Sequence, residues 1–160
     1  MSPEQFTARI RKQPPAPAYL FIGQEGYQRR ICKEALVARV GAGGLTQFDL
    51  ENATLSEVLD DARSMSLFAS DRLIWICSAE LALPRRLSAD TDGEQGSNTA
   101  QSQLAEYLKS PTPGTVLVFE CSRYDFAGED RAKIERVQKF YSAVGEMVEF
   151  RQFTPEASRF

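Results

Sequence analysis

Short apolar runs alternate with helical repeats along this chain. The runs are continuous and bounded by glycine or polar residues, which is typical of strands buried on both faces of a sheet. The predicted strands are Ala18–Gly23, the weaker Leu45–Leu50, Arg72–Cys77, Thr115–Glu120 and Met147–Phe150. Because helical repeats separate the strands, the pattern predicts a three-layer α/β fold. We expect a parallel five-stranded sheet with helices on both faces and right-handed crossovers.

Apolar residues at helical spacing predict four helices. The first follows Gly26 and ends at the glycine-rich stretch Gly41–Gly44, and the second begins at a capping box formed by Thr54 and Glu57. A short helix is expected before Pro111, and a last one before the final strand. The residues expected on the buried faces are Tyr27, Ile31, Ala35 and Leu36; then Leu55, Val58, Leu59, Ala62, Met65 and Ala69; then Leu104 and Leu108; and finally Ile134, Val137, Tyr141 and Val144.

A polar stretch interrupts this alternation between the third and fourth strands. Residues Pro84–Gln103 are rich in small polar side chains and carry little apolar surface. Ordering a residue costs about 1–2 kcal/mol, which such a segment offsets poorly by burial. The sequence therefore predicts a mobile surface insertion here.

Two large apolar residues stand apart from the buried face of the second helix. When that helix is projected at about 100° per residue, Leu67 and Phe68 fall on its opposite side. Either the helix has already ended and both side chains turn into the core, or they form an exposed patch that binds a partner. The helical pattern alone leaves both interpretations open.

Composition and charge narrow the class of protein. With 160 residues, of which 42% are hydrophobic and 26% charged, the chain has the size and balance of one globular domain. The net charge of −3 gives no general attraction to nucleic acid. No apolar run approaches the roughly 20 residues of a membrane span, and residues 1–17 do not form a signal peptide. We therefore expect a cytoplasmic protein with no membrane partner.

The sequence lacks the side chains that most enzyme mechanisms need. Histidine is absent, which removes Ser-His-Asp and Cys-His nucleophiles and the commonest general base at neutral pH. Three widely spaced cysteines, Cys32, Cys77 and Cys121, fit neither a disulfide framework nor a zinc site. Free cysteines are commonly buried, so we expect these three in the core.

The turn after the first strand begins like a nucleotide-binding loop and does not finish as one. Gly23 and Gly26 lie between strand and helix, but a phosphate-binding loop also needs glycine, lysine and a hydroxyl where this chain has Gln28, Arg29 and Arg30. The third predicted strand also ends without the acidic residue that would hold magnesium. We therefore expect a degenerate loop that binds no nucleotide, and a protein with no catalytic residue, no metal and no cofactor.

Three stretches, taken in order, resemble the delta subunit of the bacterial DNA polymerase III clamp loader. They are the degenerate glycine turn, Ser64–Ile76 and Tyr107–Asp125, and the resemblance extends over Ala18–Pro155. It implies an N-terminal domain of the AAA+ type that does not hydrolyse ATP. The task of that domain in the family is to bind the ring-shaped sliding clamp and help to open it during DNA replication.

The resemblance also implies a binding motif. The family's clamp contact is a short apolar peptide similar to Gln-Leu-Ser-Leu-Phe, which maps onto Ser64, Met65, Ser66, Leu67 and Phe68. The apolar positions match, whereas Ser64 stands where the general peptide has glutamine. With the family in view, the exposed interpretation of Leu67 and Phe68 is favoured.

The same resemblance implies domain boundaries and partners. We expect an AAA+-like clamp-binding domain over residues 1–153, and the start of a helical lid domain over residues 154–160, where Thr154 and Pro155 resemble a helix start. The expected partners are the sliding clamp, other loader subunits through C-terminal domains beyond this sequence, and DNA through the assembled complex.

Two other classes of function stay open on the sequence. One is a hydrolase or kinase of the phosphate-loop type with an unusual site, and the other is an α/β interaction domain of unrelated role. A measurement of nucleotide binding separates the first from a clamp-loader subunit, and a clamp pull-down separates the second.

Overall fold

A five-stranded parallel sheet forms the centre of the computed structural model, which describes residues 1–40, 44–64, 71–83 and 91–151, with 91–99 described by their backbone alone. The strand order is β2-β3-β4-β1-β5, and each pairing is parallel. The strands are β1 (Ala18–Ile22), β2 (Leu45–Asp49), β3 (Arg72–Cys77), β4 (Thr115–Cys121) and β5 (Met147–Glu149). Each of the five strands predicted from apolar runs is confirmed to within one residue at either end.

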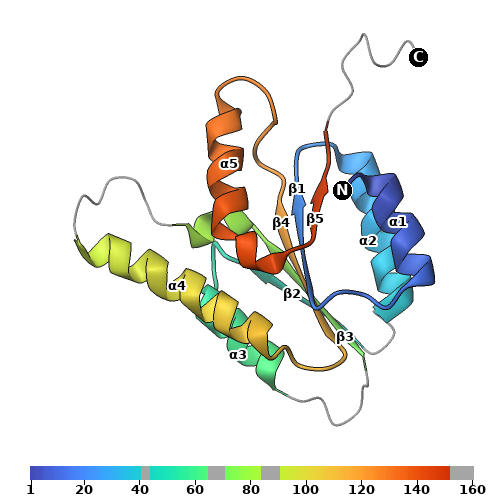
Figure 1. Ribbon diagram of the computed structural model, residues 1–160, viewed down its shortest axis with the longest axis horizontal. Helices are drawn as coiled ribbons and strands as arrows, with labels where there is room; N and C mark the ends of the chain where they lie inside the picture. The colour runs from blue at the N-terminus through green and yellow to red at the C-terminus, as the bar shows by residue number, and fades with distance from the viewer. Residues whose placement is uncertain (41–43, 65–70, 84–90, 152–160) are drawn as a thin grey trace.

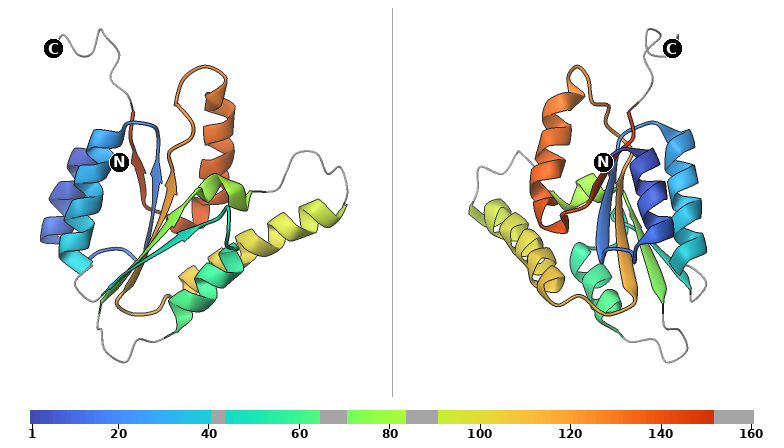
Figure 2. Two further views of the ribbon diagram at one scale, coloured as in Figure 1. Left: turned by 180° about the vertical axis from the view of Figure 1, so that it is seen from behind. Right: turned by 45° about the vertical axis from the view of Figure 1, so that its right-hand side comes forward.

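Helices cover both faces of this sheet (Figure 1, Figure 2). One layer consists of α1 (Pro3–Lys12) and α2 (Gly26–Val40). The other consists of α3 (Leu55–Arg63), α4 (Thr91–Lys109) and α5 (Asp130–Phe140), with the short 3-10 helices η2 (Ala79–Ala82) and η3 (Ser142–Val144). The predicted three-layer α/β architecture is therefore confirmed.

The core is divided by the sheet into two apolar clusters. Alternate residues of a strand point to opposite faces, so Tyr19 and Phe21 of β1 join the cluster under α1 and α2, whereas Leu20 and Ile22 join the cluster under α3, α4 and α5. Both faces of β1 are buried, which explains why this strand is a continuous apolar run.

Helix α1 was not predicted. It begins at a capping box in which Ser2 and Gln5 satisfy each other's backbone N–H groups, and proline occupies its first position. Phe6 and Ile10 are its buried residues, and the Phe6 ring packs edge-on against Tyr19 and Phe21. Two large apolar residues in ten make a weak periodic signal, although the capping box was visible in the sequence.

The buried face of α2 differs from the predicted one. Cys32, Leu36 and Val40 are buried and recur every four residues, whereas Tyr27 is 67% exposed in the first turn. Ile31 and Ala35 are only half-buried. Cys32 acts as a small apolar residue. Had it been counted as apolar, the pattern would have predicted the buried face of α2 correctly.

Helix α4 corrects the predicted mobile insertion at Pro84–Gln103. Residues 91–103 belong to a 19-residue helix, and residues 84–90 lie outside the described part of the chain. Leu104 and Tyr107, in the C-terminal half of the helix, are 0% and 2% exposed and pack it onto the core. The N-terminal half is the polar one. Among the described residues, no helix is long and apolar enough to cross a membrane.

The last predicted helix is shorter than its apolar pattern. Ile134 and Val137 are buried in α5, which ends at Phe140. Tyr141 and Val144 are buried as predicted, but they reach the core from the following turn and from η3. The Tyr141 hydroxyl donates a hydrogen bond to the Ala79 carbonyl at 2.6 Å, which joins this turn to η2.

Candidate functional site

The glycine turn after β1 is packed too closely for any side chain. Gly23 has a φ of +128°, and a Cβ placed on it would lie 2.1 Å from the Phe150 carbonyl oxygen. Its N–H donates to the Cys121 carbonyl at 3.0 Å, and the Glu25 N–H donates to the Phe150 carbonyl at 3.2 Å. The turn is therefore fixed between the ends of β4 and β5, and glycine is required at this position by its backbone.

The N-terminus of α2 is occupied by a carboxylate from its own chain. Glu25 directly precedes the helix, and its two carboxylate oxygens accept hydrogen bonds from the N–H groups of Tyr27 at 3.0 Å and Gln28 at 2.6 Å. In nucleotide-binding proteins of this topology, such N–H groups and the positive end of the helix dipole bind phosphate. Here they bind Glu25.

Arg29 forms contacts with the glycine turn and with the end of β4. It donates hydrogen bonds to the carbonyls of Gly23 at 3.0 Å and Glu25 at 3.3 Å, and its Nε pairs with the Glu120 carboxylate at 2.9 Å. The side chains of Arg29 and Glu120 are only 20% and 18% exposed. Arg30 is exposed and lines an open hollow beside this pair.

The carboxyl ends of β2, β3 and β4 carry Asp49, Cys77 and Glu120, and ligands of open α/β sheets bind at this edge. Burial first, and then the carboxylates of Glu120 and Asp49, raise the pKa of Cys77 to about 11, against a smaller opposing effect of Lys33. Glu80 lies beyond the strand, in η2. Within the described ranges, no cluster of three or more Cys, Asp or Glu side chains could hold a metal ion.

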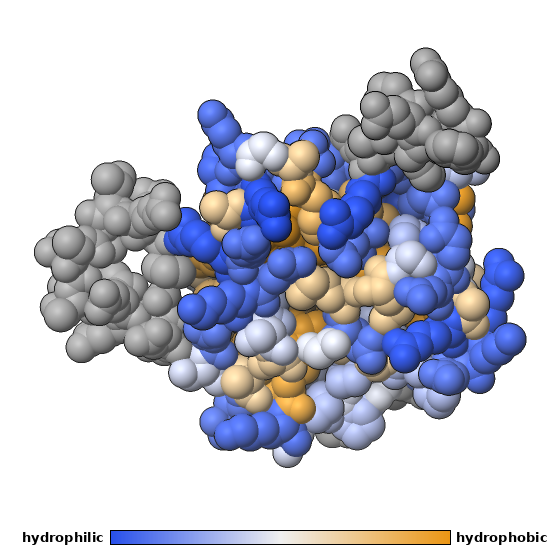
Figure 3. Space-filling model, turned by 45° about the horizontal axis from the view of Figure 1, so that its top comes forward, coloured by the Kyte–Doolittle hydropathy of each residue, from blue (hydrophilic) through white to orange (hydrophobic). Residues whose placement is uncertain are grey.

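Figure 3 looks toward this carboxyl edge of the sheet from above. Hydrophilic residues form most of the visible described surface, with smaller apolar areas between them. A hollow of about 390 Å³ lies nearby between the start of α1, Glu25 and the end of β5. Its lining carries the carboxylates of Glu4, Glu25 and Glu149 together with Arg151 and the N-terminal residue Met1, so it has no net positive charge to attract a phosphate group.

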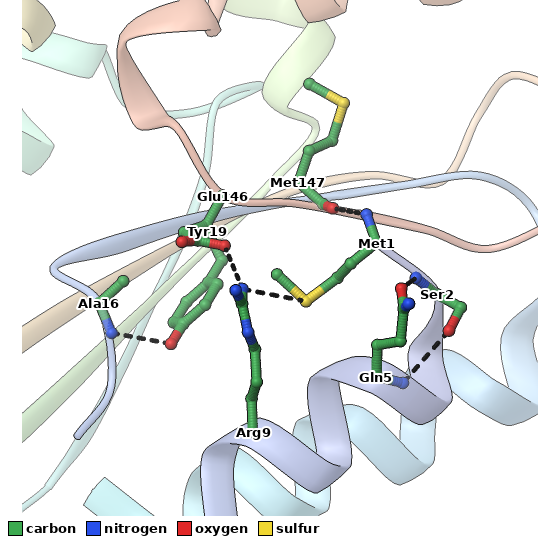
Figure 4. Close-up of polar contacts among 8 residues, drawn as sticks. All are labelled: Met1, Ser2, Gln5, Arg9, Ala16, Tyr19, Glu146 and Met147. Carbon is green, nitrogen blue, oxygen red and sulfur yellow. Dashed lines mark hydrogen bonds and ion pairs between the residues drawn. The ribbon is translucent and has the colours of Figure 1, made fainter. Parts of the chain in front are cut away.

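Contacts at the amino ends of β1 and β5 hold α1 in place, as Figure 4 shows. The amino group of Met1 donates to the Met147 carbonyl of β5 at 2.6 Å, and Arg9 pairs with Glu146 at 3.1 Å. The Tyr19 hydroxyl accepts a hydrogen bond from the Ala16 N–H at 2.8 Å, and burial raises the pKa of Tyr19. We assign these contacts a structural role, because they join α1 to β1 and β5.

The predicted clamp-binding residues begin where α3 ends. Leu55, Val58, Leu59 and Ala62 are buried, as the helical pattern predicted. The helix itself ends at Arg63, because Ser64 has an extended backbone (φ −73°, ψ 131°). The other residues that the helical projection covered, Met65, Leu67, Phe68 and Ala69, lie outside the described part of the chain.

The structure places only Ser64 of the five predicted clamp-binding residues. Ser64 is exposed, and its Oγ donates to the Asp61 carbonyl at 2.7 Å. Met65, Ser66, Leu67 and Phe68 lie outside the described residues. The chain returns at Asp71 and Arg72, at the amino edge of the sheet, which is the edge opposite the glycine turn.

Sequence reasoning missed three residues that organise these two regions. Glu25 was recognisable as a polar residue directly before a helix start, and Glu120 as a charged residue at the end of an apolar strand. Arg72 opens β3, and nothing in its sequence position indicated that its side chain would bind α3. Its contact depends on long-range packing.

Comparison with known proteins agrees with this geometry. The family model described as DNA polymerase III, delta subunit, matches residues 19–142. The chain is similar to the solved structure of the Bacillus subtilis DNA clamp loader delta protein YqeN, with a TM-score of 0.69 and 18% sequence identity. The similarity covers 96% of this chain and 44% of that chain, so this chain spans less than half of that protein's length. At that identity the structural likeness supports the fold alone.

A search of curated proteins found no match. The family match therefore carries the assignment, and it covers well over half of the 160 residues, from the start of β1 to the turn after α5. The chain belongs to the DNA polymerase III delta subunit family.

Proposed function

We propose that this chain is the clamp-binding domain of a clamp-loader delta subunit. In this proposal it binds the sliding clamp through Met65, Leu67 and Phe68, flanked by Ser64 and Ser66, and biases the ring toward opening. The observation that carries the proposal is the family match, whose range, residues 19–142, includes these positions. The membership itself makes the chain a component of the DNA polymerase III replication machinery.

The domain is proposed to act without ATP hydrolysis. The geometry of the glycine turn supports this, because Glu25 occupies the helix N-terminus and Arg29 is paired with Glu120. A hydrolase or kinase would need both groups to release these contacts before phosphate could enter. This observation disfavours the phosphate-loop enzyme that the sequence left open.

The remaining assignments follow from the family. We propose that residues 1–153 form the AAA+-like domain and that residues 154–160 begin a helical lid domain. Other loader subunits would bind through further C-terminal domains, and DNA would be reached through the assembled complex, in the cytoplasm.

The decisive test is the double variant Leu67→Ala with Phe68→Ala. Apolar anchors at a hot spot contribute about 2–4 kcal/mol each when truncated, so binding to the cognate sliding clamp, measured by biolayer interferometry, should be lost. The melting temperature should change little if neither side chain belongs to the core. Met65→Ala serves as a comparison and should weaken binding less than the double variant.

Two results would contradict the assignment. One is a double variant that binds the clamp as tightly as the wild type. The other is a double variant that unfolds, which would place Leu67 and Phe68 in the core.

A further inference from the structure

Arg72 links the two ends of the segment that contains the proposed clamp-binding residues. It is the first residue of β3, and its N–H donates to the Gly114 carbonyl at 2.8 Å. It also stands in register with Thr115 of β4. Because β3 pairs with both β2 and β4, it is an interior strand, and the backbone of Arg72 is fixed at its amino end.

The guanidinium of Arg72 reaches the last turn of α3. It forms an ion pair with the Asp61 carboxylate, and its Nη1 donates to the Asp61 carbonyl at 2.9 Å. Its Nη2 also lies 3.3 Å from Thr46 Oγ1 of β2. The side chain is 17% exposed, so these contacts are partly shielded from water and from salt.

The Asp61 carbonyl is also the acceptor that ends the helix. It accepts hydrogen bonds from the Ser64 N–H at 3.1 Å and from Ser64 Oγ at 2.7 Å. The last carbonyls of a helix have no partner within the helix and need one from outside. Arg72 and Ser64 together supply that partner, so the guanidinium binds at the point where α3 ends and the segment begins.

We propose that Arg72 is a positioning residue for clamp binding, a role that rests on the proposed function of residues 64–68. By joining Asp61 at the end of α3 to the start of β3, it fixes the described residues on both sides of the clamp-binding residues relative to each other. A loop whose ends are fixed in the free protein loses less conformational entropy when it binds a partner. The clamp-binding residues would therefore be presented by a contact that does not itself touch the clamp.

The structure offers a matched control at the opposite edge of the sheet. Arg29 is also a half-buried arginine, 20% exposed, that pairs with a carboxylate and donates to main-chain carbonyls. Its removal should destabilise the domain for the same physical reasons as removal of Arg72. Only Arg72 is joined to the ends of the clamp-binding segment.

The experiment compares Arg72→Ala with Arg29→Ala in the full 160-residue chain. Binding to the cognate sliding clamp is measured at a temperature where both variants are folded by circular dichroism. We expect the Kd of Arg72→Ala to rise about tenfold and that of Arg29→Ala to stay within about twofold of the wild type. Hydrogen exchange of the amides between residues 61 and 72 should be faster in Arg72→Ala alone.

Two conservative variants test the contact if Arg72→Ala does not fold. Asp61→Asn keeps the main-chain acceptor and removes the charge, and Arg72→Lys keeps the charge but cannot bind two acceptors as a planar fork. Both should give a Kd between those of the wild type and Arg72→Ala.

The outcomes separate this role from the proposed function. If Leu67→Ala with Phe68→Ala abolishes clamp binding while folded Arg72 variants bind like the wild type, the positioning role is wrong and the proposed function stands. The positioning role is also wrong if Arg29→Ala weakens binding as much as Arg72→Ala. A wild-type chain that does not bind its clamp would overturn both.

Discussion

At the scale of single residues, the two glycines of the turn after β1 are there for different reasons. Gly23 has a positive φ, and its Cα faces the Phe150 carbonyl. Gly26 has no such constraint, since a Cβ placed there would lie 3.6 Å from Arg29 Nη2, an ordinary contact distance. The resemblance to a phosphate loop therefore reflects one glycine that packing requires and one that it does not.

Gly23→Ala should destabilise the domain by more than about 2 kcal/mol. The substitution combines an unfavourable φ with a clash against backbone that belongs to the end of β5. Gly26→Ala should instead be neutral or stabilise slightly, because it reduces the entropy of the unfolded chain. Urea unfolding of both variants measures the difference, and equal stabilities would show that the turn relaxes around the added methyl group.

At the scale of elements, the start of α2 decides whether the domain can bind nucleotide. Glu25 binds two N–H groups that a phosphate would need, and a second anion at the same helix end would be repelled. We therefore expect no magnesium-dependent ATP binding by calorimetry and no phosphate release. Glu25→Ala should cost about 1 kcal/mol of stability, as lost N-caps do. Saturable heat with Mg-ATP in the wild type would contradict this interpretation.

The strands are the elements that the sequence predicts best. All five strands were predicted, because β1, β3 and β4 are apolar on both faces and β2 and β5 lie in the same alternation. Helix α1 escaped prediction because only Phe6 and Ile10 mark its buried face. The start of α4 escaped because its helical hydrogen bonds extend into a polar stretch.

The candidate site could be predicted only where the residues that decide its chemistry are close together in the sequence. The failed phosphate loop was evident at Gln28, Arg29 and Arg30, since the missing lysine and hydroxyl can be read from their spacing. The pairing of Arg29 with Glu120 and of Arg72 with Asp61 joins residues far apart in sequence. Such contacts depend on how helices pack on the sheet, which residue patterns do not specify.

At the scale of the whole molecule, buried cysteines lie in both halves of the core, one on each side of the sheet. Cys32 lies in the cluster under α1 and α2, and Cys121 lies in the cluster under α3, α4 and α5. Burial raises the pKa of both thiols from 9.0 to about 12. Cys77, at the sheet edge between these layers, has its pKa raised to about 11, again chiefly by burial.

These thiols should make the folded state less stable in alkali. An unfolded chain releases the three protons near pH 9, whereas the folded chain retains them, so the unfolded state binds fewer protons and the free energy of unfolding falls as pH rises. The loss should begin near pH 9 and continue toward pH 12. Urea unfolding at pH 7.5, 9 and 10.5 measures this slope. A variant with all three cysteines replaced by alanine should show a shallower slope, and the buried tyrosines should account for part of the slope that remains.

Iodoacetamide at pH 8.5 provides the matching kinetic test, because a neutral buried thiol is a poor nucleophile. Labelling of Cys32 and Cys121 should wait for global unfolding, since one lies on each side of the sheet and no single local opening exposes both. Rapid labelling of either thiol in the folded protein would show that its half of the core opens locally. An unchanged alkaline slope in the triple variant would show that the thiols do not cause the loss of stability.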